Sequence, residues 1–341
     1  ATGVFLGAVG IGLTGHIQNQ WQLFIVYGFI YAIGHAATAI STVSVLIARW
    51  FSNRQGLANS IAISGNGIGQ LIIVTLLASF LSSIDWRSSY TILGIANFVI
   101  VIPLVLVTIR DETPSCSSRF IGSNKTAIDQ PAQHATGGRV QGSVQLIFKS
   151  KQLWILLLVY AICGFQDFFV ATHVVAFALD LGLAYRVAGH ILAFMGVLGI
   201  MGVLISSAVS DKFGPARPVF LCFLIRLPIF AFIMLEQNTT TIVIFAFLYG
   251  FTFLMTAPLA VIFSAKLFGS QRLGMINGLI SSVHQISGGL GAFVGAMIFD
   301  LWNTYNGAFL LMAVLSSIGL ISAITLHKGM NPSTSIKSTS R

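Results

Sequence analysis

The first 48 residues of the chain contain no Asp, Glu, Lys or Arg. Over all 341 residues, 8% are charged and 55% are hydrophobic, and the mean hydropathy is +0.89. Soluble domains carry roughly 25% charged residues, so this chain has too few to cover a water-exposed surface. The composition predicts a polytopic membrane protein, and it excludes a soluble fold, a disordered chain and a basic nucleic-acid-binding domain.

Apolar segments separated by polar residues divide the chain into ten spans. Several exceed 20 residues without the alternation of a barrel strand, which predicts helices. The first segment is shorter than the ~20 residues that a bilayer span needs, so we expect it to be the end of a helix. The predicted spans are 1–15, 21–47, 57–81, 89–109, 152–176, 187–209, 218–235, 241–265, 273–299 and 306–327.

The Lys and Arg residues predict the orientation of these spans. One set of alternate loops holds fifteen of the 18, the other set holds Arg87 and Arg186, and Arg226 lies inside a span. Loops rich in Lys and Arg stay in the cytoplasm. The chain is therefore predicted to start by running outward, with the segment 110–151 and the C-terminus cytoplasmic in the plasma membrane. The net charge of +9 is a topology signal and indicates no nucleic-acid partner.

The segment 110–151 is the one long connection, and its polar composition indicates a flexible linker. It separates an N-terminal bundle of four spans (1–109) from a C-terminal bundle of six (152–327), which a tail (328–341) follows. The three cysteines, Cys116, Cys163 and Cys222, have no metal-ligand spacing, so we expect neither a disulfide framework nor a zinc site. No cofactor is predicted.

The two bundles carry a weak internal repeat. Arg-Gln-Gly-Leu-Ala-Asn-Ser at 54–60 opens one span, and Arg-Leu-Gly-Met-Ile-Asn-Gly at 272–278 opens another span 218 positions later. Both follow a predicted cytoplasmic loop and lead into helices rich in small residues. Many secondary transporters are built from such repeats.

Four stretches together resemble the major facilitator superfamily, in particular its monocarboxylate-porter-like branch near the oxalate/formate antiporters. They are Ala-Arg-Trp-Phe with Arg-x-Gly-x-Ala at 48–58, Asp-Trp-Arg at 85–87, Ser-x₃-Asp-x₂-Gly-x₂-Arg at 207–217, and His-Gln-x₂-Gly-x₂-Gly-Ala-x₂-Gly at 284–295. The resemblance implies an all-α, two-bundle membrane fold in which ten of twelve transmembrane helices are present. The segment 1–15 is then the remnant of the third helix.

Arg226 lies near the middle of its span, where a charge requires a specific reason. Arginine forms a bidentate pair with carboxylates, so Arg226 is a candidate ligand for a substrate carboxylate. The alternative is structural: Pro228 leaves the Leu224 carbonyl without its helical partner, and the guanidinium could satisfy such carbonyls.

Asp167 lies in the middle of a span that, by the resemblance, corresponds to the seventh helix of the superfamily, which lines the central cavity. Burial without a cation would raise its affinity for a proton, so Asp167 is a candidate proton carrier, with a structural helix-packing carboxylate as the alternative. His173 is a weaker candidate for proton coupling. His190, Asn66, Tyr249 and Thr256 are weaker candidates of the same polar kind.

His284 shares a helix face with three glycines, and Gln285 lies one position round. A protonated imidazole there could bind an anion, so His284 and Gln285 are candidate substrate ligands. The small residues equally predict close packing against another helix, with His284 bonded to its backbone. Tyr31 and His35 belong to a second candidate surface, a polar stripe that would line the cavity; its members are Tyr27, Tyr31, His35, Thr38 and Thr42.

Five residues near loop ends are predicted to act in conformational change. Asp211 could accept backbone N–H groups or pair with a cytoplasmic arginine and so latch the inward ends shut. The alternative is a solvated loop. The proposed latch consists of Asp211, Gly214, Arg217, Arg54 and Arg272.

These residues predict a secondary transporter for a small organic anion such as a monocarboxylate, working by alternating access, with proton coupling as an option. A membrane-embedded enzyme would need a catalytic cluster at one membrane face, and the short loops hold none. A second alternative is a sensor or structural protein on the same fold, or an inactive truncated fragment. The expected partners are the substrate and the lipid bilayer, with no obligate protein partner.

Overall fold

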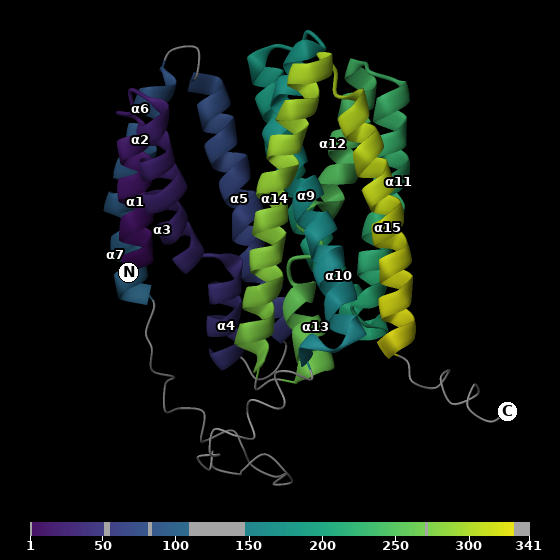
Figure 1. The fold of residues 1–341 in the computed structure, drawn as a ribbon. Helices are drawn as coiled ribbons and strands as arrows, with labels where there is room; N and C mark the ends of the chain where they lie inside the picture. The colour runs from purple at the N-terminus through teal and green to yellow at the C-terminus, as the bar shows by residue number, and fades with distance from the viewer. Residues whose placement is uncertain (1, 51–54, 81–83, 109–146, 270–271, 331–341) are drawn as a thin grey trace, which may run out of the picture.

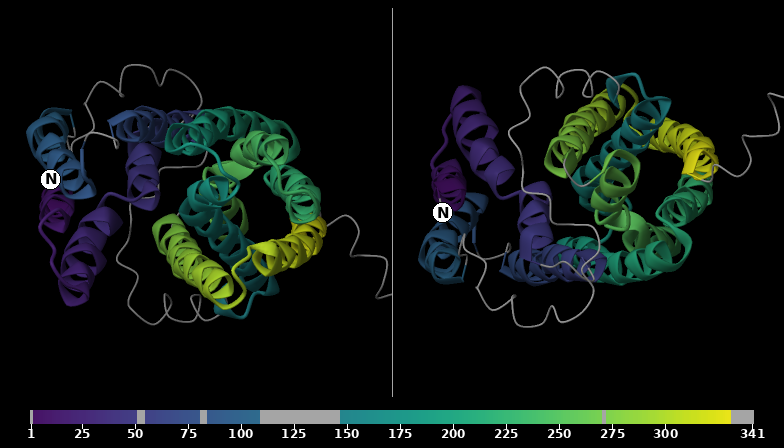
Figure 2. Two further views of the ribbon diagram at one scale, coloured as in Figure 1. Left: turned by 90° about the horizontal axis from the view of Figure 1, so that it is seen from above. Right: turned by 90° about the horizontal axis from the view of Figure 1, so that it is seen from below.

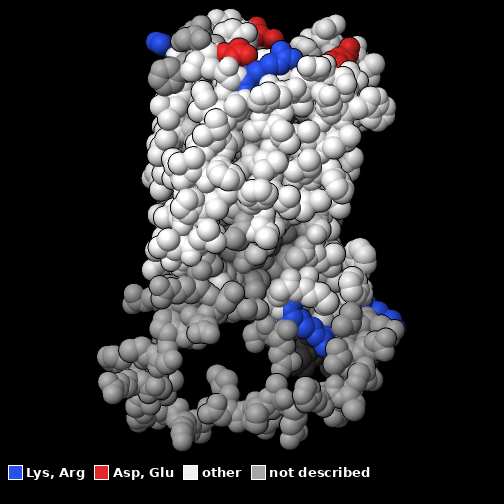
Figure 3. Space-filling view, turned by 90° about the vertical axis from the view of Figure 1, so that its left-hand side faces the viewer, with Lys and Arg blue, Asp and Glu red and all other residues white. Residues whose placement is uncertain are grey.

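The computed structural model describes residues 2–50, 55–80, 84–108, 147–269 and 272–330. Within these ranges the chain is helical (Figure 1). Eight helical segments are long and apolar enough to cross a membrane, and three shorter apolar helices accompany them. On the face drawn in Figure 3, the charged side chains gather near the two ends, and an uncharged surface separates them. This arrangement matches the apolar belt of a multi-pass integral membrane protein.

The N-terminal half consists of helices that group on one side of the molecule (Figure 2). Asn19 and Asp85 cap two of them, each accepting a hydrogen bond from the N–H three residues later. Two of the helices contain a π-helical stretch. The elements are α1 (Thr2–Thr14), α2 (Gln20–Ile25), η1 (Val26–Tyr31), α3 (Ala32–Ala37), α4 (Ile40–Trp50), α5 (Gln55–Phe80), α6 (Trp86–Ala96), η2 (Asn97–Val101) and α7 (Ile102–Thr108).

The C-terminal half begins after the predicted linker, most of which lies outside the described residues. Its helices form the second group in Figure 2. Two hydrophobic clusters, one of them rich in aromatic rings, pack between these helices. The elements are α9 (Lys151–Asp180), α10 (Tyr185–Phe213), α11 (Ala216–Leu235), α12 (Thr239–Phe253), α13 (Leu259–Phe268), α14 (Leu273–Trp302) and α15 (Asn306–Met330).

Two spans that we expected to be continuous contain breaks. The expected span 21–47 is interrupted after α3, where Thr38 bonds the carbonyls of Gly34 and His35 through its own hydroxyl. The expected span 241–265 is interrupted between α12 and α13, where Pro258 has no N–H to continue the helix. Thr38 and Thr256 are 218 positions apart, the spacing of the sequence repeat, so the two halves break at corresponding positions.

The halves meet along α5 and α10, with a smaller contact between α4 and α14. Small residues allow the close approach: a Cβ atom on Gly67 would lie 2.4 Å from the Gly196 carbonyl oxygen. Gln70 Nε2 donates to the Leu192 carbonyl oxygen at 2.7 Å, and the hydroxyls of Ser60 and Ser207 are hydrogen-bonded to each other. This interface positions the N-terminal helices against the six-span half.

Candidate functional site

A buried ion pair joins α9 to α11. Arg226 Nη2 lies 2.7 Å from Asp167 Oδ1, and the arginine has no exposed surface. Asp167 is the one charged residue in 152–176, and Arg226 is the one in 218–235. Charged groups in a membrane interior pair with one another because an unpaired charge there is costly.

Arg226 directs its remaining donors to other protein groups. Its Nε donates to Thr252 Oγ1 at 3.1 Å, its Nη2 to the Thr252 carbonyl oxygen at 2.9 Å, and its Nη1 to Gln166 Oε1 at 3.2 Å. The guanidinium also lies over the Tyr249 ring, 4.6 Å from the centroid. Four of its five N–H groups are therefore bonded within the C-terminal half.

Asp167 connects this buried network to a more accessible side chain. Tyr249 Oη donates to Asp167 Oδ1 at 2.9 Å. On the other carboxylate oxygen, His284 Nε2 lies 3.6 Å from Asp167 Oδ2. The His284 side chain is 25% exposed, whereas that of Asp167 is 9% exposed. The cluster therefore runs from a fully buried guanidinium to a partly accessible imidazole.

Gln166 ties this cluster to α15. Its Nε2 donates to the Met312 carbonyl oxygen at 3.0 Å and to Ser316 Oγ at 2.8 Å, while its Oε1 accepts from Arg226. The side chain has no exposed surface. The two bonds of Nε2 fix the orientation of the Gln166 amide, and this orientation directs Oε1 at Arg226.

The partners of both charged residues come from neighbouring helices. The condition under which Asp167 was expected to bind a proton, burial without a cation, is not met, because Arg226 is in contact with it. The structural alternative for Arg226, that the guanidinium satisfies a backbone carbonyl at an interrupted helix, fits its bond to the Thr252 carbonyl oxygen. The sequence considered each span separately and did not indicate these contacts.

The glycine face of α14 packs tightly on α9. Cβ atoms on Gly291 and Gly295 would lie 2.1 Å from the Phe165 carbonyl oxygen and 2.6 Å from the Phe169 ring. This contact holds His284 next to Asp167, with the His284 ring edge-on to Phe168 at a centroid distance of 6.0 Å. Gln285 is exposed and stands beside this contact.

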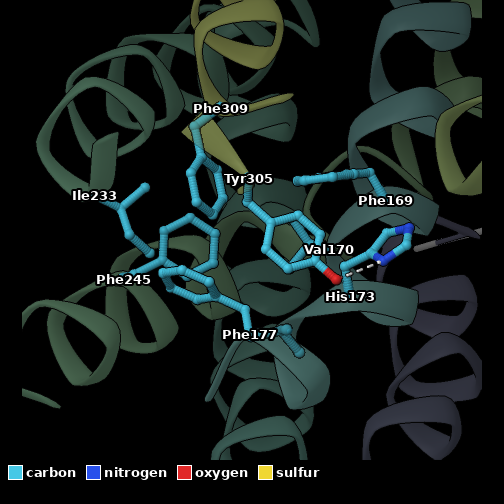
Figure 4. A pocket seen from close by; sticks show the side chains of 9 residues that line it. Phe169, Val170, His173, Phe177, Ile233, Phe245, Tyr305 and Phe309 are labelled. Carbon is cyan, nitrogen blue, oxygen red and sulfur yellow. Dashed lines mark hydrogen bonds between the residues drawn. The ribbon is translucent and has the colours of Figure 1, made fainter. Parts of the chain in front are cut away.

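His173 lies elsewhere on α9, in a cluster of aromatic rings (Figure 4). Its Nε2 donates to the Ala292 carbonyl oxygen at 2.9 Å, and its Nδ1 lies 3.3 Å from Tyr305 Oη. Because a carbonyl only accepts, Nε2 carries the proton, and the Nδ1 of a neutral ring accepts from Tyr305. Burial raises the pKa of the Tyr305 hydroxyl, which therefore remains a donor.

The pocket beside His173 is lined by packed apolar side chains. Rings of Phe177, Phe245 and Phe309 surround it, together with Phe169, Val170, Val174, Ile233 and Tyr305. His173 and Tyr305 supply its polar atoms, and these are bonded to each other or to the backbone. The geometry suits a helix contact better than an anion site, and proton coupling by His173 stays a prediction.

Part of the expected polar stripe is a stack of rings in the N-terminal half. Tyr27 stacks on Tyr31 at a centroid distance of 4.8 Å, and Tyr31 stacks on His35 at 5.6 Å. Thr38 lies at the helix break, and Thr42 lies beyond it in α4, so the stripe does not continue along one straight helix. Tyr31 and Asn66 lie 218 positions before Tyr249 and His284, so the repeat relates them to two residues of the Asp167 cluster.

The predicted latch residues that the structure describes lie at helix ends or in the last turn of a helix. Asp211 is exposed and lines a hollow with Leu57, Ser207 and two further residues of α10, next to the start of α5. Gly214 ends α10 with φ +85°, a conformation that favours glycine. Arg217 stacks over Phe213 at 4.8 Å, and Arg272 is the N-cap of α14. Arg54 lies outside the described residues.

Gln166 and Thr252 were not anticipated as site residues. Thr252 is buried near the end of α12, and its role depends on Arg226 reaching it from α11. One signal could have found the cluster: one acidic and one basic residue in the middle of apolar spans of the same half require each other. Tyr249 was recognised as a polar candidate, but its partner was not.

Comparison with known proteins identifies the family. The sequence profile of the Major Facilitator Superfamily matches residues 1–242 and 176–340. The chain belongs to the Major Facilitator Superfamily. It is 25% identical over 333 residues to the uncharacterized MFS-type transporter YcxA of Bacillus subtilis, covering 94% of this chain and 77% of that protein. The predicted resemblance to this superfamily is confirmed.

Further similar proteins are transporters. The chain is 22% identical to monocarboxylate transporter 12-B of Danio rerio, covering 95% of this chain and 72% of that protein. It is 25% identical to monocarboxylate transporter 13 of Rattus norvegicus, covering 95% and 72%. The crystal structure of the Escherichia coli fucose:proton symporter FucP has the same fold, with a TM-score of 0.65 at 16% identity over 95% of this chain and 82% of FucP. This superfamily member is a transporter with a small-molecule substrate, as expected, and the predicted all-α fold is confirmed.

Proposed function

We propose that this superfamily member is a secondary active transporter that moves a small organic anion, of the monocarboxylate kind, together with a proton. The observation that carries the proposal is the cluster of Asp167, Arg226 and His284. It joins one acid, one permanent cation and one titratable base inside an apolar half. The names of two similar proteins, both monocarboxylate transporters, support the substrate class.

The charges of the cluster favour binding of an anion together with a proton. With Asp167 ionised, Arg226 charged and His284 neutral, the cluster has no net charge. One added proton gives it a charge of +1, whether the imidazole or the carboxylate holds that proton. A bound monocarboxylate then restores neutrality. The empty and the fully loaded cluster are thus both neutral, which minimises the penalty for moving charge through an apolar interior.

The accessible side of the cluster is the proposed place for substrate. His284 and the exposed Gln285 can present a cation and an amide to a carboxylate. Tyr31, His35 and Asn66 are proposed to contact substrate from the N-terminal half. Arg226 is proposed to act through Asp167, since it has no exposed surface.

The proposal also includes orientation and conformational change. The loops rich in Lys and Arg, the segment 110–151 and the C-terminus are proposed to be cytoplasmic in the plasma membrane. Asp211, Gly214, Arg217, Arg54 and Arg272 are then at the cytoplasmic end. There they are proposed to hold the inward ends of the two halves together during alternating access.

Transport by the full chain in proteoliposomes tests this function. Radiolabelled short monocarboxylates are supplied with an inward proton gradient, and separately under counterflow without a gradient. We expect gradient-driven uptake, and we expect Asp167→Asn to abolish it while sparing counterflow. No carboxylate movement under either condition would disprove the function. Equal loss of both activities in Asp167→Asn would disprove the role of Asp167 as proton carrier.

A further inference from the structure

The break between α12 and α13 is buried, and side chains from other helices hold its carbonyl groups. Thr252, Met255 and Thr256 are each at most 3% exposed. The Thr252 carbonyl oxygen accepts from Arg226 of α11, and the Thr256 carbonyl oxygen accepts from Tyr160 Oη of α9 at 2.9 Å. Each carbonyl oxygen also accepts a backbone N–H, from Met255 at 3.2 Å for Thr252 and from Leu259 at 3.1 Å for Thr256. The two side-chain donors therefore add a second hydrogen bond to each carbonyl at the break.

Arg226 holds the break and Asp167 at the same time. Nη2 is the shared atom, because it contacts Asp167 Oδ1 at 2.7 Å and the Thr252 carbonyl oxygen at 2.9 Å. Nε adds a bond to the Thr252 hydroxyl, which in turn donates to the Tyr249 carbonyl oxygen at 2.9 Å. A change of charge on Asp167 therefore acts directly on the donor that stabilises the end of α12.

The corresponding break in the N-terminal half has a different partner. The repeat places Gly34 at the position of Thr252 and Ala8 at the position of Arg226. There the Gly34 carbonyl oxygen accepts from the hydroxyl of Thr38, four residues later in the same segment. One break is thus held locally by a hydroxyl, whereas the other is held by a cation that also pairs with an acid.

The charge-linked break lies next to the interface between the halves. A Cβ atom on Gly202 of α10 would lie 1.8 Å from the Phe251 carbonyl oxygen of α12, so α12 packs directly on α10. α10 also packs on α5 of the N-terminal half. A shift at the end of α12 therefore displaces α10, the helix on which the two halves meet, because closely packed backbones cannot move independently.

We infer that Arg226 and Thr252 are positioning residues that couple the charge of Asp167 to the break between α12 and α13 and, through α10, to the packing of the two halves. The inference rests on the proposed function in taking Asp167 as the group whose charge changes during transport. When Asp167 is neutral, Arg226 loses its ionic partner and retains its acceptors on Gln166 and Thr252. The break and the α10–α5 contact then adopt a different balance of conformations.

The groups that face Asp167 define what can change its charge. Arg226 faces it from α11, Tyr249 from α12 and His284 from α14, with Gln166 adjacent on α9. Arg226 stays charged at every accessible pH, so we take Asp167 and His284 as the groups of the cluster whose charge can change. Replacing Asp167 by Asn fixes the neutral state of the carboxylate without a change of pH.

Distance measurements between spin labels test the coupling on the full chain in lipid nanodiscs. Labels are placed at Ile61→Cys in α5 and Met275→Cys in α14, two exposed side chains of different halves. Cys116 is replaced by Ser, while Cys163 and Cys222 are buried and do not react. The ratio of distance populations is compared with and without Asp167→Asn in four backgrounds: parent, Thr252→Ser, Thr252→Val and Tyr160→Phe.

We expect Asp167→Asn to change the population ratio about fivefold or more in the parent, the range of typical coupling between sites. Thr252→Ser keeps the hydroxyl and should retain this change, and so should Tyr160→Phe, which removes a bond at the break that Arg226 does not make. Thr252→Val removes the hydroxyl that Arg226 Nε bonds but keeps the carbonyl that Nη2 bonds, so it should make the change smaller than in the parent. If Thr252→Val does not fold, Thr252→Ala replaces it with the same expectation.

An equal response to Asp167→Asn in the parent and in Thr252→Val would overturn the inference, as would no response in any background. The measurement uses no substrate. If the transport assay fails, the spin-label result can still be interpreted. If the spin-label experiment fails, the proposed anion and proton coupling is still tested by the transport assay.

Discussion

Gly164 of α9 lies against the backbone of His284 in α14, so closely that a Cβ atom on Gly164 would stand 2.1 Å from the His284 carbonyl oxygen. The obstacle is backbone rather than a flexible side chain. The absence of a side chain at position 164 therefore sets the distance between the two helices that carry Asp167 and His284.

Replacing Gly164 by Ala should force α9 and α14 apart and separate His284 from Asp167. Overpacking of this kind costs about 1–3 kcal/mol, so we expect a lower thermal unfolding midpoint and reduced transport. Gly289→Ala is the matched control, because a Cβ atom there meets nothing within 4 Å. Unchanged unfolding and transport in Gly164→Ala would contradict the role of this contact.

A second glycine sets the distance between the two halves. A Cβ atom on Gly67 of α5 would lie 2.4 Å from the Gly196 carbonyl oxygen and 2.6 Å from Ile200 Cγ1 of α10. Gly67→Ala should lower the unfolding midpoint and slow transport, because overpacking the α5–α10 contact costs about 1–3 kcal/mol. Gly69→Ala on the same helix has open space and should behave like wild type in both assays. A loss of equal size in both variants would contradict the role of the α5–α10 contact, because the effect would then come from any glycine substitution in α5.

Hydropathy was sufficient to predict a membrane protein made of helices, because a bilayer requires long apolar spans whose backbone groups bond internally. The superfamily fold was predicted from the four sequence motifs. The close contact of α9 with the glycine face of α14 was likewise foreseeable, since Gly288, Gly291 and Gly295 recur at helical spacing with His284. Pro258 was visible in the span 241–265 and signals its break. The break after Ala37 has no proline to signal it, and it becomes clear only in the structure.

The candidate site was predictable as a set of residues but not as a set of contacts. Asp167, Arg226 and His284 each stood out because polar groups are rare in apolar spans. Which of them meet depends on how α9, α11 and α14 are rotated about their axes, and no single span determines that rotation. Gln166 and Thr252 escaped notice because an amide and a hydroxyl are unremarkable until a buried cation needs acceptors.

Asp85 should give a measurable pH dependence at the start of α6. Its carboxylate accepts from Ser88, and this hydrogen bonding holds the pKa of Asp85 below its ordinary value of 3.8. A lowered pKa in the folded state means that the stabilisation is fully present above the ordinary value and is lost as the pH falls through the folded-state value. Unfolding midpoints measured from pH 6 down to pH 3 should therefore fall less steeply in Asp85→Asn, which keeps the cap but cannot titrate. Parallel curves for the two proteins would refute this assignment.

Gln166 should matter more to stability than its neutral side chain suggests. Gln166→Leu conserves approximate volume but leaves an Arg226 N–H without its acceptor and Ser316 without a donor. Each buried polar group left unsatisfied costs about 1–3 kcal/mol, so we expect a large drop in the unfolding midpoint of the purified protein. Ser317→Ala removes a hydroxyl that bonds only within α15, to the Ala313 carbonyl oxygen, and should have a small effect. If both variants unfold at the same temperature, Gln166 does not support the buried arginine, and the network that holds Arg226 would reduce to Asp167 and Thr252.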